Sequence, residues 1–358
     1  MSQSGILEVL HALVACDTQN PPRQIDGDSA IFQVCAKASG PAYETRTWDH
    51  GDGHVSWYAV RGKPRVLFNV HLDTVPVIEG SRFPPLELKI ENGRAYGRGS
   101  CDIKGAAACL LDVAVSTSKP MALLFTTDEE GASGICVDEF VLSEQCRAFR
   151  QVVVAEPTDC LAILSHRGYL SVKGQFVGVP GHSSEPRALT DNALHKLSRW
   201  VTDAVSLAAR MDSEGRRPCF NVGTVSGGIK SNVIADQANL HWSARLSPGD
   251  SNQDFLEAMT GLDTSGSASW QVPFAGPPMP TDGQDTSRAQ AFVDRHGLET
   301  GPAVNFWTEA SLFARAGTPA IVLGPGNIAQ AHVVDEWVSV DQLERALEIY
   351  EKLVNDHD

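Results

Sequence analysis

The hydrophobic positions of the chain follow two different patterns. Near both ends, short unbroken apolar runs alternate with longer segments of helical periodicity, and the runs cover residues 66–70, 121–125, 152–155 and 320–323. Unbroken runs of Val, Leu and Ile between helices are typical of parallel strands that are covered on both faces. We therefore predict an α/β domain with a mostly parallel sheet and helices on both of its faces.

Three segments carry the helical signal of this domain. Residues 103–115 are rich in Ala and Leu, and segments 1–22 and 341–354 each gather their apolar residues on one helical face. The middle of the chain differs, because apolar and polar residues alternate more. There we expect a helix over 191–210 and strands that include 238–246. Strands and a helix in this order predict a smaller α+β domain with an antiparallel sheet.

Length and composition fit this division. The chain has 358 residues, which is more than one core usually holds. We expect a catalytic, metal-binding domain formed by residues 1–165 and 275–358, and a lid or dimerisation domain inserted between them at 166–274. A net charge of −15 argues against nucleic acid and anionic membranes as partners, since both attract clustered Lys and Arg.

Two further features bear on location. We find no run of the roughly 20 apolar residues that a membrane span needs. The eight cysteines form no CxxC pair, and the chain is long for a disulfide framework. We therefore expect reduced thiols and a cytoplasmic protein.

Metal-ligand-type residues follow the predicted strands. His71 ends the first run, Glu130 follows the second, and Glu156 follows the third. Because the carboxyl ends of parallel strands meet at one edge of a sheet, these side chains are expected to lie close together. Asp102, before the helix at 103–115, and His332, near the C-terminus, complete a set of five.

Nitrogen and oxygen donors of this kind suit Zn, Co or Mn, and two such ions activate water for hydrolysis. Asp102 is the natural bridge, since a short carboxylate can give one oxygen to each ion. His71 and Glu156 would complete one ion, and Glu130 with His332 the other.

Two neighbouring acids complete the predicted catalytic group. Asp73 lies two residues after His71 and is placed to orient its ring. Glu129, beside Glu130, is placed to act as a base. Each residue alone has a plainer interpretation: a lone His is usually a satisfied polar residue, Asp102 is also a candidate helix cap, and the Glu pair suits a solvated turn. It is the combination that favours a metal site, and no GxxxxGK[ST], GxSxG or HExxH motif competes with it.

Five motifs carry a resemblance to a known family. They are HLDTVP (71–76), GRGSCDIKG (97–105), DEEG (128–131), AEP (155–157) and GHSS (181–184). In this order they resemble the di-zinc aminoacylase/carboxypeptidase family of metallohydrolases, which includes acetylornithine deacetylase. The resemblance implies an α/β catalytic domain interrupted by a lid, a homodimer formed through that insertion, two Zn or Co ions, and Glu129 as general acid and base.

Three further runs are similar to the acetylornithine and acetylcitrulline deacetylase branch, and to the acetylcitrulline side in particular. They are FWTEASLF (306–313), GGIKSN (227–232) and IAQAH (328–332). This similarity implies hydrolysis of the acetyl group of an Nα-acetyl-L-amino acid, a small-molecule substrate of arginine biosynthesis. A dipeptidase, a carboxypeptidase or a succinyl-diaminopimelate desuccinylase on the same scaffold stays open as an alternative, as does an inactive dimeric binding protein.

The same resemblance suggests the residues that contact the substrate. His182, from the lid of the opposite subunit, would stabilise the oxyanion. Arg245, with Asn232, would grip the α-carboxylate, for which a guanidinium fork suits better than an ammonium. Without the resemblance these three would pass for a surface histidine, a strand charge and a turn residue.

Three more residues bear on the choice of substrate. Gly326, in a GPG turn, offers a backbone N–H near the carboxylate, although a plain Gly/Pro turn explains it equally well. Lys230 would repel the ammonium of ornithine, which favours citrulline. Glu309 would face the substrate's side chain, or would only support a residue that does.

Overall fold

The computed structural model describes residues 3–22, 24–281 and 283–356, and these fold into two compact units. The first unit comprises Met1–Leu164, Asp285–Ala303 and Thr308–Asp358, and the second comprises Ser165–Gln284 and Val304–Trp307. The second unit thus interrupts the first in sequence. No helix in the described ranges is both long and apolar enough to cross a bilayer.

The first unit contains the following elements, in chain order. Its helices are α1 (Gln3–Val14), α2 (Ala30–Ser39), α3 (Gly105–Ser116), α4 (Ile135–Leu142), α8 (Ser287–His296), α9 (Ala310–Arg315) and α10 (Val340–Asn355), with short helical turns η1 (Ser100–Lys104), η2 (Cys146–Ala148) and η3 (Ile328–Gln330). Its strands are β1 (Glu44–Asp49), β2 (Val55–Arg61), β3 (Val66–His71), β4 (Lys89–Glu91), β5 (Arg94–Tyr96), β6 (Met121–Thr126), β7 (Gln151–Val154), β12 (Ala320–Val322) and β13 (Trp337–Ser339).

Six of these strands form the main sheet, in the order β1-β2-β6-β3-β7-β12. Strands β6, β3, β7 and β12 are mutually parallel, and they are the four apolar runs of the sequence. The hairpin of β1 and β2 extends the sheet antiparallel to β6. The prediction of a mostly parallel sheet is confirmed.

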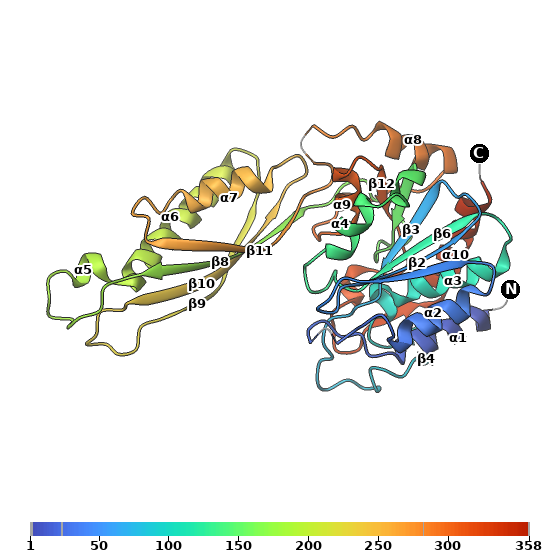
Figure 1. Cartoon of the computed structure of the whole chain (residues 1–358), viewed down its shortest axis with the longest axis horizontal. Coiled ribbons are helices and arrows are strands. Elements are labelled where there is room, and N and C mark those ends of the chain that lie inside the picture. The colour runs from blue at the N-terminus through green and yellow to red at the C-terminus, as the bar shows by residue number, and fades with distance from the viewer. Residues whose placement is uncertain (1–2, 23, 282, 357–358) are drawn as a thin grey trace. The chain divides into compact units, whose positions relative to one another are not determined.

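Helices cover both faces of this sheet (Figure 1). All six residues of β3 are buried, so the strand has no solvent face. On one side, the ring of Phe68 lies 5.7 Å from that of Tyr350 in α10. On the other, Asn69 donates a hydrogen bond to Glu309, the residue that precedes α9. Continuous apolar runs are needed in strands that must pack on both faces.

The core of the unit lies around α3. Ten of its residues, from Gly105 to Ala114, are buried, because α1, α2 and α10 all pack against this helix. A helix that is apolar on all sides belongs in the interior rather than at the surface. Its position matters for function, because η1, which carries Asp102, leads directly into α3.

The second unit is an antiparallel α+β domain, as the sequence predicts. Its sheet has the order β11-β8-β10-β9, and all three strand pairs are antiparallel. These strands are β8 (Gly168–Val177), β9 (Cys219–Gly227), β10 (Gln237–Leu246) and β11 (Ala268–Gly276), and the helices are α5 (Ala188–Asp191), α6 (Ala193–Ser213) and α7 (Asn252–Thr260). Burial alternates along β10, so one face packs on a core that includes Trp200 of α6.

Candidate metal centre

The carboxyl ends of three adjacent parallel strands bring the candidate ligands together. His71 is the last residue of β3 and is paired with Thr126, the last residue of β6. Asn69 is paired with Val154, the last residue of β7. The side chains of Glu130 and Glu156, which follow β6 and β7 by a few residues, therefore start from the same edge of the sheet as His71.

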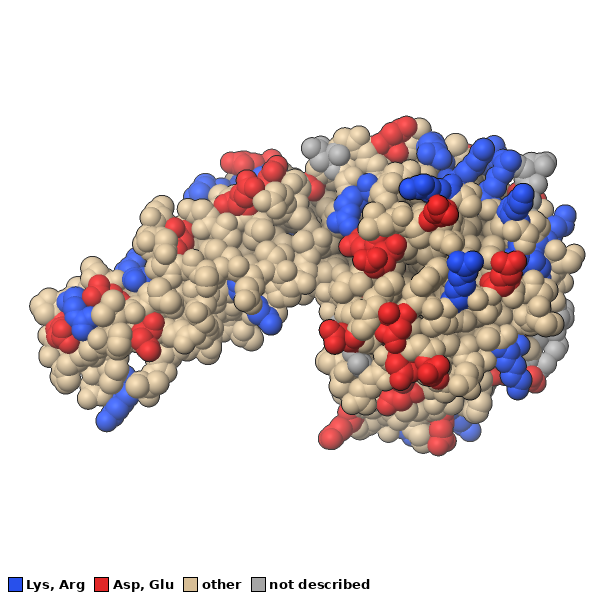
Figure 2. All heavy atoms as spheres, viewed as in Figure 1, with Lys and Arg blue, Asp and Glu red and all other residues tan. Residues whose placement is uncertain are grey.

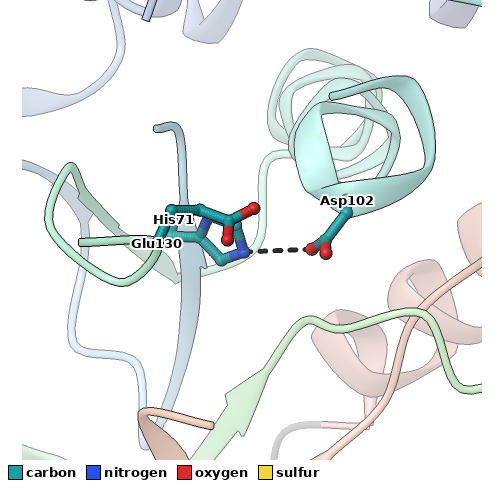
Figure 3. Close-up of side chains that lie close together, drawn as sticks. All are labelled: His71, Asp102 and Glu130. Carbon is teal, nitrogen blue, oxygen red and sulfur yellow. Dashed lines mark hydrogen bonds and ion pairs between the residues drawn. The ribbon is translucent and has the colours of Figure 1, made fainter. Parts of the chain in front are cut away.

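Two histidines and two carboxylates meet at this edge. Nε2 of His71 lies 3.1 Å from Oδ1 of Asp102, while Nε2 of His332 lies 3.2 Å from Oδ2 of the same carboxylate. His332 also lies 3.0 Å from Oε1 of Glu130. Figure 3 shows His71, Asp102 and Glu130 with their side chains directed toward one another, and their ligand atoms lie within 4.8 Å of one another. Asp102 thus presents one oxygen to each imidazole.

Asp73 and Asn20 position the first of these ligands. Nδ1 of His71 donates to the backbone oxygen of Asp73 at 3.0 Å, and the Oδ1 carboxylate oxygen of Asp73 lies 3.5 Å from the same nitrogen. The other carboxylate oxygen of Asp73 accepts hydrogen bonds from the side chain of Asn20 and from the backbone N–H of Glu130. Since Nδ1 is engaged, Nε2 of His71 is the nitrogen that faces the cluster.

Glu336 holds the loop that carries Asp102, and nothing in the sequence motifs points to it. Its carboxylate accepts backbone hydrogen bonds from Gly99, Cys101 and Asp102, each at 3.0 Å. Arg98 completes the arrangement with an ion pair of 2.6 Å, and both side chains are almost fully buried. Arg98 lies within a family-like motif, whereas Glu336 comes from 234 residues later in the chain than Asp102 and has no local signal.

Several carboxylates lie close together at this site, away from most of the solvent. The pKa of Glu129 is raised well above its ordinary value by burial and by the neighbouring Glu130 and Asp102 carboxylates, against the effect of His71. Burial and the Asp102 carboxylate raise the pKa of Glu156 in the same way. Both acids therefore lie within electrostatic reach of the cluster. Without a nearby cation, the ionised form of each is disfavoured there.

The pKa values of both imidazoles are raised as well, which favours their charged form. Hydrogen bonds to Asp102 and Glu130 raise the pKa of His332 to about 10, against the effect of its partial burial. Burial opposes the charge of His71, yet hydrogen bonds to Asp102 and Asp73 raise its pKa well above the ordinary value. For Asp102, burial is outweighed by the two histidines, which hold its pKa below the usual range.

This donor set fits divalent metal ions. It combines two imidazole nitrogens with three carboxylates, at a site where protons or cations must balance the charge. One oxygen of the buried Glu156 side chain, Oε1, has no hydrogen-bond partner among the described residues. An unpartnered carboxylate oxygen in a dry site is costly unless a cation lies beside it. His71, Asp102, Glu130, Glu156 and His332 are therefore all candidates to hold metal.

Two predicted substrate residues of the first unit are engaged inside the protein. Glu309 is 1% exposed, and its Oε2 accepts hydrogen bonds from Asn69 and Thr126. The backbone N–H of Gly326 donates to Oε1 of Gln342, and its positive φ of 88° suits glycine. The Gly326 N–H is thus occupied, and Glu309 is buried with only its Oε1 unpartnered among the described residues, so we propose neither as a direct substrate contact.

The predicted substrate residues of the second unit fall into two places. His182 and Asn232 lie together, because the backbone N–H of Ser183 donates to the backbone oxygen of Asn232 at 3.1 Å. Both residues and the nearby Lys230 are exposed. Arg245 lies near the other end of β10, with its guanidinium 3.9 Å above the ring of Tyr169. Arg245 lies eight positions after Gln237, the first residue of β10, which corresponds to roughly 25 Å.

The first unit gathers imidazoles and carboxylates at the carboxyl edge of a parallel sheet, and an antiparallel domain interrupts it in sequence. This combination defines a metallohydrolase of the peptidase type. The model of peptidase family M20/M25/M40 matches residues 67–356, and the chain belongs to this family. The family is metal-dependent. The resemblance seen in the sequence motifs is thereby confirmed.

Relatives of the chain include deacetylases. It is 41% identical over 365 residues, covering 98% of both chains, to N-acetyl-L-citrulline deacetylase of Xanthomonas campestris pv. campestris. It is 32% identical over 296 residues to acetylornithine deacetylase of Edwardsiella ictaluri, covering 76% of this chain and 74% of the other. Aminopeptidase PepT from Bacillus cereus superposes with a TM-score of 0.75 at 16% identity, covering 99% and 98% of the chains, which shows a shared fold.

Proposed function

We propose that the protein is a metal-dependent amidohydrolase that removes the acetyl group from an Nα-acetyl-L-amino acid. N-acetyl-L-citrulline is the preferred substrate in this proposal, ahead of N-acetyl-L-ornithine. The observation that carries it is the 41% identity, across 98% of both chains, to a protein named N-acetyl-L-citrulline deacetylase. The convergence of His71, Asp102 and Glu130 at the carboxyl edge of the sheet supports the hydrolytic chemistry.

The donor set supports two divalent ions, Zn or Co. His71, Asp102 and Glu156 would hold one ion, and Asp102, Glu130 and His332 the other, because Asp102 has one oxygen beside each imidazole. When bound, such ions polarise an amide carbonyl and lower the pKa of water.

Glu129 is the proposed general base and acid. It lies half-buried beside the cluster and has no hydrogen bond to either imidazole, so we propose no ligand role for it. Its raised proton affinity suits a carboxylate that takes a proton from water and passes it to the leaving nitrogen of the amide. Asp73 supports this step indirectly, since it fixes both His71 and the backbone of Glu130.

Residues of the second unit are proposed to recognise the rest of the substrate. Arg245 would bind the α-carboxylate, and its stacking on Tyr169 holds the guanidinium in one orientation. Both His182 and Asn232 would contact a substrate bound to the partner copy. His182 would stabilise its acyl oxygen, and Asn232 would bind its α-carboxylate. Lys230, near them, would disfavour the ammonium group of ornithine, which supports the neutral side chain of citrulline.

The second unit is accordingly proposed as both lid and dimerisation domain, and the protein as a homodimer. The long separation of Asn232 from Arg245 along β10 supports this, because a small ligand cannot touch both within one copy. A cytoplasmic location is proposed from the cysteines, all eight of which are free thiols.

A deacylation panel tests the function. Acetylcitrulline, acetylornithine, acetylglutamate and succinyl-diaminopimelate are each assayed with the Zn-loaded and the Co-loaded protein, with dipeptides alongside. We expect the highest kcat/KM on acetylcitrulline and no turnover after the metal is removed with a chelator. A higher kcat/KM on dipeptides would replace the deacetylase by a peptidase. Inertness toward every substrate, with only trace metal after gentle purification, would favour an inactive binding protein.

A further inference from the structure

A basic cavity lies in the first unit at the opposite edge of the main sheet from the metal centre. Its volume is about 530 Å3, and its lining includes Lys63, Arg65, Arg150, Arg288 and Arg295. Figure 2 shows Lys and Arg side chains gathered over the region of α8 on a molecule that is otherwise strongly acidic. The function proposed above makes no use of this cavity.

The fold explains why these cations meet. Arg65 directly precedes β3 and Arg150 directly precedes β7, and the two strands are parallel neighbours. The backbone N–H of Arg150 donates to the backbone oxygen of Arg65 at 2.8 Å, so the two residues lie side by side. The amino ends of these strands thus carry two arginines, whereas their carboxyl ends lead to metal ligands.

Helix α8 contributes the facing wall. Arg288, Ala291, Phe292 and Arg295 all line the cavity, and their spacing of i, i+3, i+4 and i+7 places them along one stripe of the helix. The stripe presents an arginine at each end and the half-buried ring of Phe292 between them. A ligand that lies along it would meet charge at both ends and an apolar surface in the middle.

Among the described residues, four of the five cations in this lining form no ion pair, although Asp285 lies within electrostatic reach of Arg288. In the ranges that the structure describes, no ion pair involves Lys63, Arg65, Arg150 or Arg288. The carboxylate in the lining is that of Asp356, which lies 3.5 Å from Nδ1 of His296. Like charges held together at this density repel one another, and an anionic ligand would relieve that repulsion.

We propose that this cavity binds a phosphorylated small molecule of nucleotide size. Guanidinium forks match phosphate oxygens bidentately, and several of them converge here with the ammonium of Lys63. The volume falls within the range of small-molecule sites, and Phe292 with Pro120 provides apolar surface for the part of the ligand that carries the phosphates. The site is distinct from the metal centre, because the six residues of β3 span roughly 20 Å between them.

Calorimetric titration of the metal-loaded protein with ATP and with inorganic tripolyphosphate tests this proposal. We expect both to bind, with an affinity that falls as salt concentration rises. The double variant Arg65→Ser/Arg288→Ser should lose at least about 10-fold in affinity for each probe. The matched control is Arg147→Ser, an exposed arginine three residues before Arg150 that is outside the cavity lining, and it should bind as the unaltered protein does.

Four results would overturn the proposal. Equal affinity in the double variant and the unaltered protein would place the phosphates at the metal centre. Citrate binding as tightly as tripolyphosphate would reduce the site to a general anion patch. Association with anionic phospholipid vesicles, without binding of ATP, would make the surface a membrane contact. No binding of either phosphate probe at millimolar concentration would remove the site. Metal content and deacylation rate, measured on each variant, confirm that it is folded.

Discussion

Glu129 and Glu130 are adjacent in sequence, yet the structure separates their surroundings. Glu130 lies 3.0 Å from His332, whereas Glu129 has no ion pair with either imidazole of the cluster. Glu129→Gln should therefore lower kcat by roughly 10²–10⁴-fold while leaving the metal content unchanged, because it removes a proton carrier and no ligand. Turnover and metal analysis of the same preparation check this. The control is Glu144→Gln, at an exposed position. Loss of one metal equivalent from Glu129→Gln would show that this residue is a ligand.

Glu309 makes a prediction about stability in the metal-free protein. Burial, together with the charge of Asp128, raises its pKa to about 8 from an ordinary 4.5. Between these values the folded state holds a proton that the unfolded state releases. The stabilisation from this proton is therefore complete below pH 4.5 and lost above pH 8. Between these values it falls by up to about 1.4 kcal/mol per pH unit as pH rises.

Glu309→Gln should remove this contribution, since an amide keeps an acceptor for Asn69 and Thr126 without a titrating proton. Urea unfolding of chelator-treated protein between pH 5 and pH 8.5 measures it. Other buried acids add slopes of the same sign, so the informative quantity is the difference between Glu309→Gln and the unaltered protein. A difference that does not change with pH would contradict the raised pKa.

At the residue scale, the sequence predicted those site residues that stand at the ends of strands. His71, Glu130 and Glu156 are predicted because each follows an apolar run, and the structure brings ligand atoms of His71 and Glu130 together with one of Asp102. Glu336 and Asn20 were missed, because they act through hydrogen bonds to segments far away in the chain. The hydrogen bond from the backbone N–H of Gly326 to Gln342 was missed for the same reason.

At the element scale, the strands that the sequence predicts best are those that are buried. The four parallel strands are buried throughout and mostly apolar, and their predicted ends lie within a residue or two of the observed ones. Strand β1, with the sequence ETRTWD, has no buried residue and gives no apolar signal. Strands β4, β5 and β13 have three residues each, which is too short for any periodicity. Their existence depends on tertiary pairing and not on local pattern.

The turn η1 illustrates an element that exists only through such tertiary contacts. Glu336 accepts three backbone hydrogen bonds from residues 99–102 and is paired with the buried Arg98. Glu336→Gln removes the charge that compensates Arg98 and should lower the free energy of unfolding by about 3–5 kcal/mol. It should also weaken metal affinity by about 10–100-fold, because the position of Asp102 is loosened.

Metal titration and urea unfolding of Glu336→Gln measure both effects. Asp335→Asn is the matched control, since this neighbouring carboxylate accepts hydrogen bonds from Ser81 and the backbone of Arg82, away from the metal ligands. It should leave metal affinity unaltered. Equal metal affinity in both variants would show that the loop holds Asp102 without help from Glu336.

At the scale of the whole molecule, the substrate proposal depends on assembly. One copy of the chain places His182 and Asn232 beyond one end of β10 and Arg245 near its other end, roughly 25 Å away. An acetylated amino acid is far smaller than this separation. If all three residues contact the same substrate molecule, Arg245 must come from one copy and His182 with Asn232 from another. Dimerisation is then a condition of activity.

The two edges of the second sheet are not equivalent, and this predicts where the copies meet. Both edge strands have an irregularity in their pairing, but β11 also contains Pro273, which discourages pairing with another strand. The opposite edge strand, β9, has nine residues, no proline, and an exposed Val225. We therefore expect two copies to associate through β9, in the manner of strand addition.

Val225→Lys places a charge on the edge strand β9 and should convert the dimer to a monomer with low kcat, since Lys on an edge strand opposes pairing between copies. Val272→Lys is the matched control, because Val272 is a similarly exposed valine on β11, at 41% against 50% for Val225. Light scattering coupled to size exclusion gives the mass of each variant, and deacylation of acetylcitrulline gives its activity. A dimer that survives Val225→Lys but not Val272→Lys would move the interface to β11. A fully active monomer would show that His182 and Asn232 are not needed from a second copy, because a single chain cannot bring them to the ligand of Arg245.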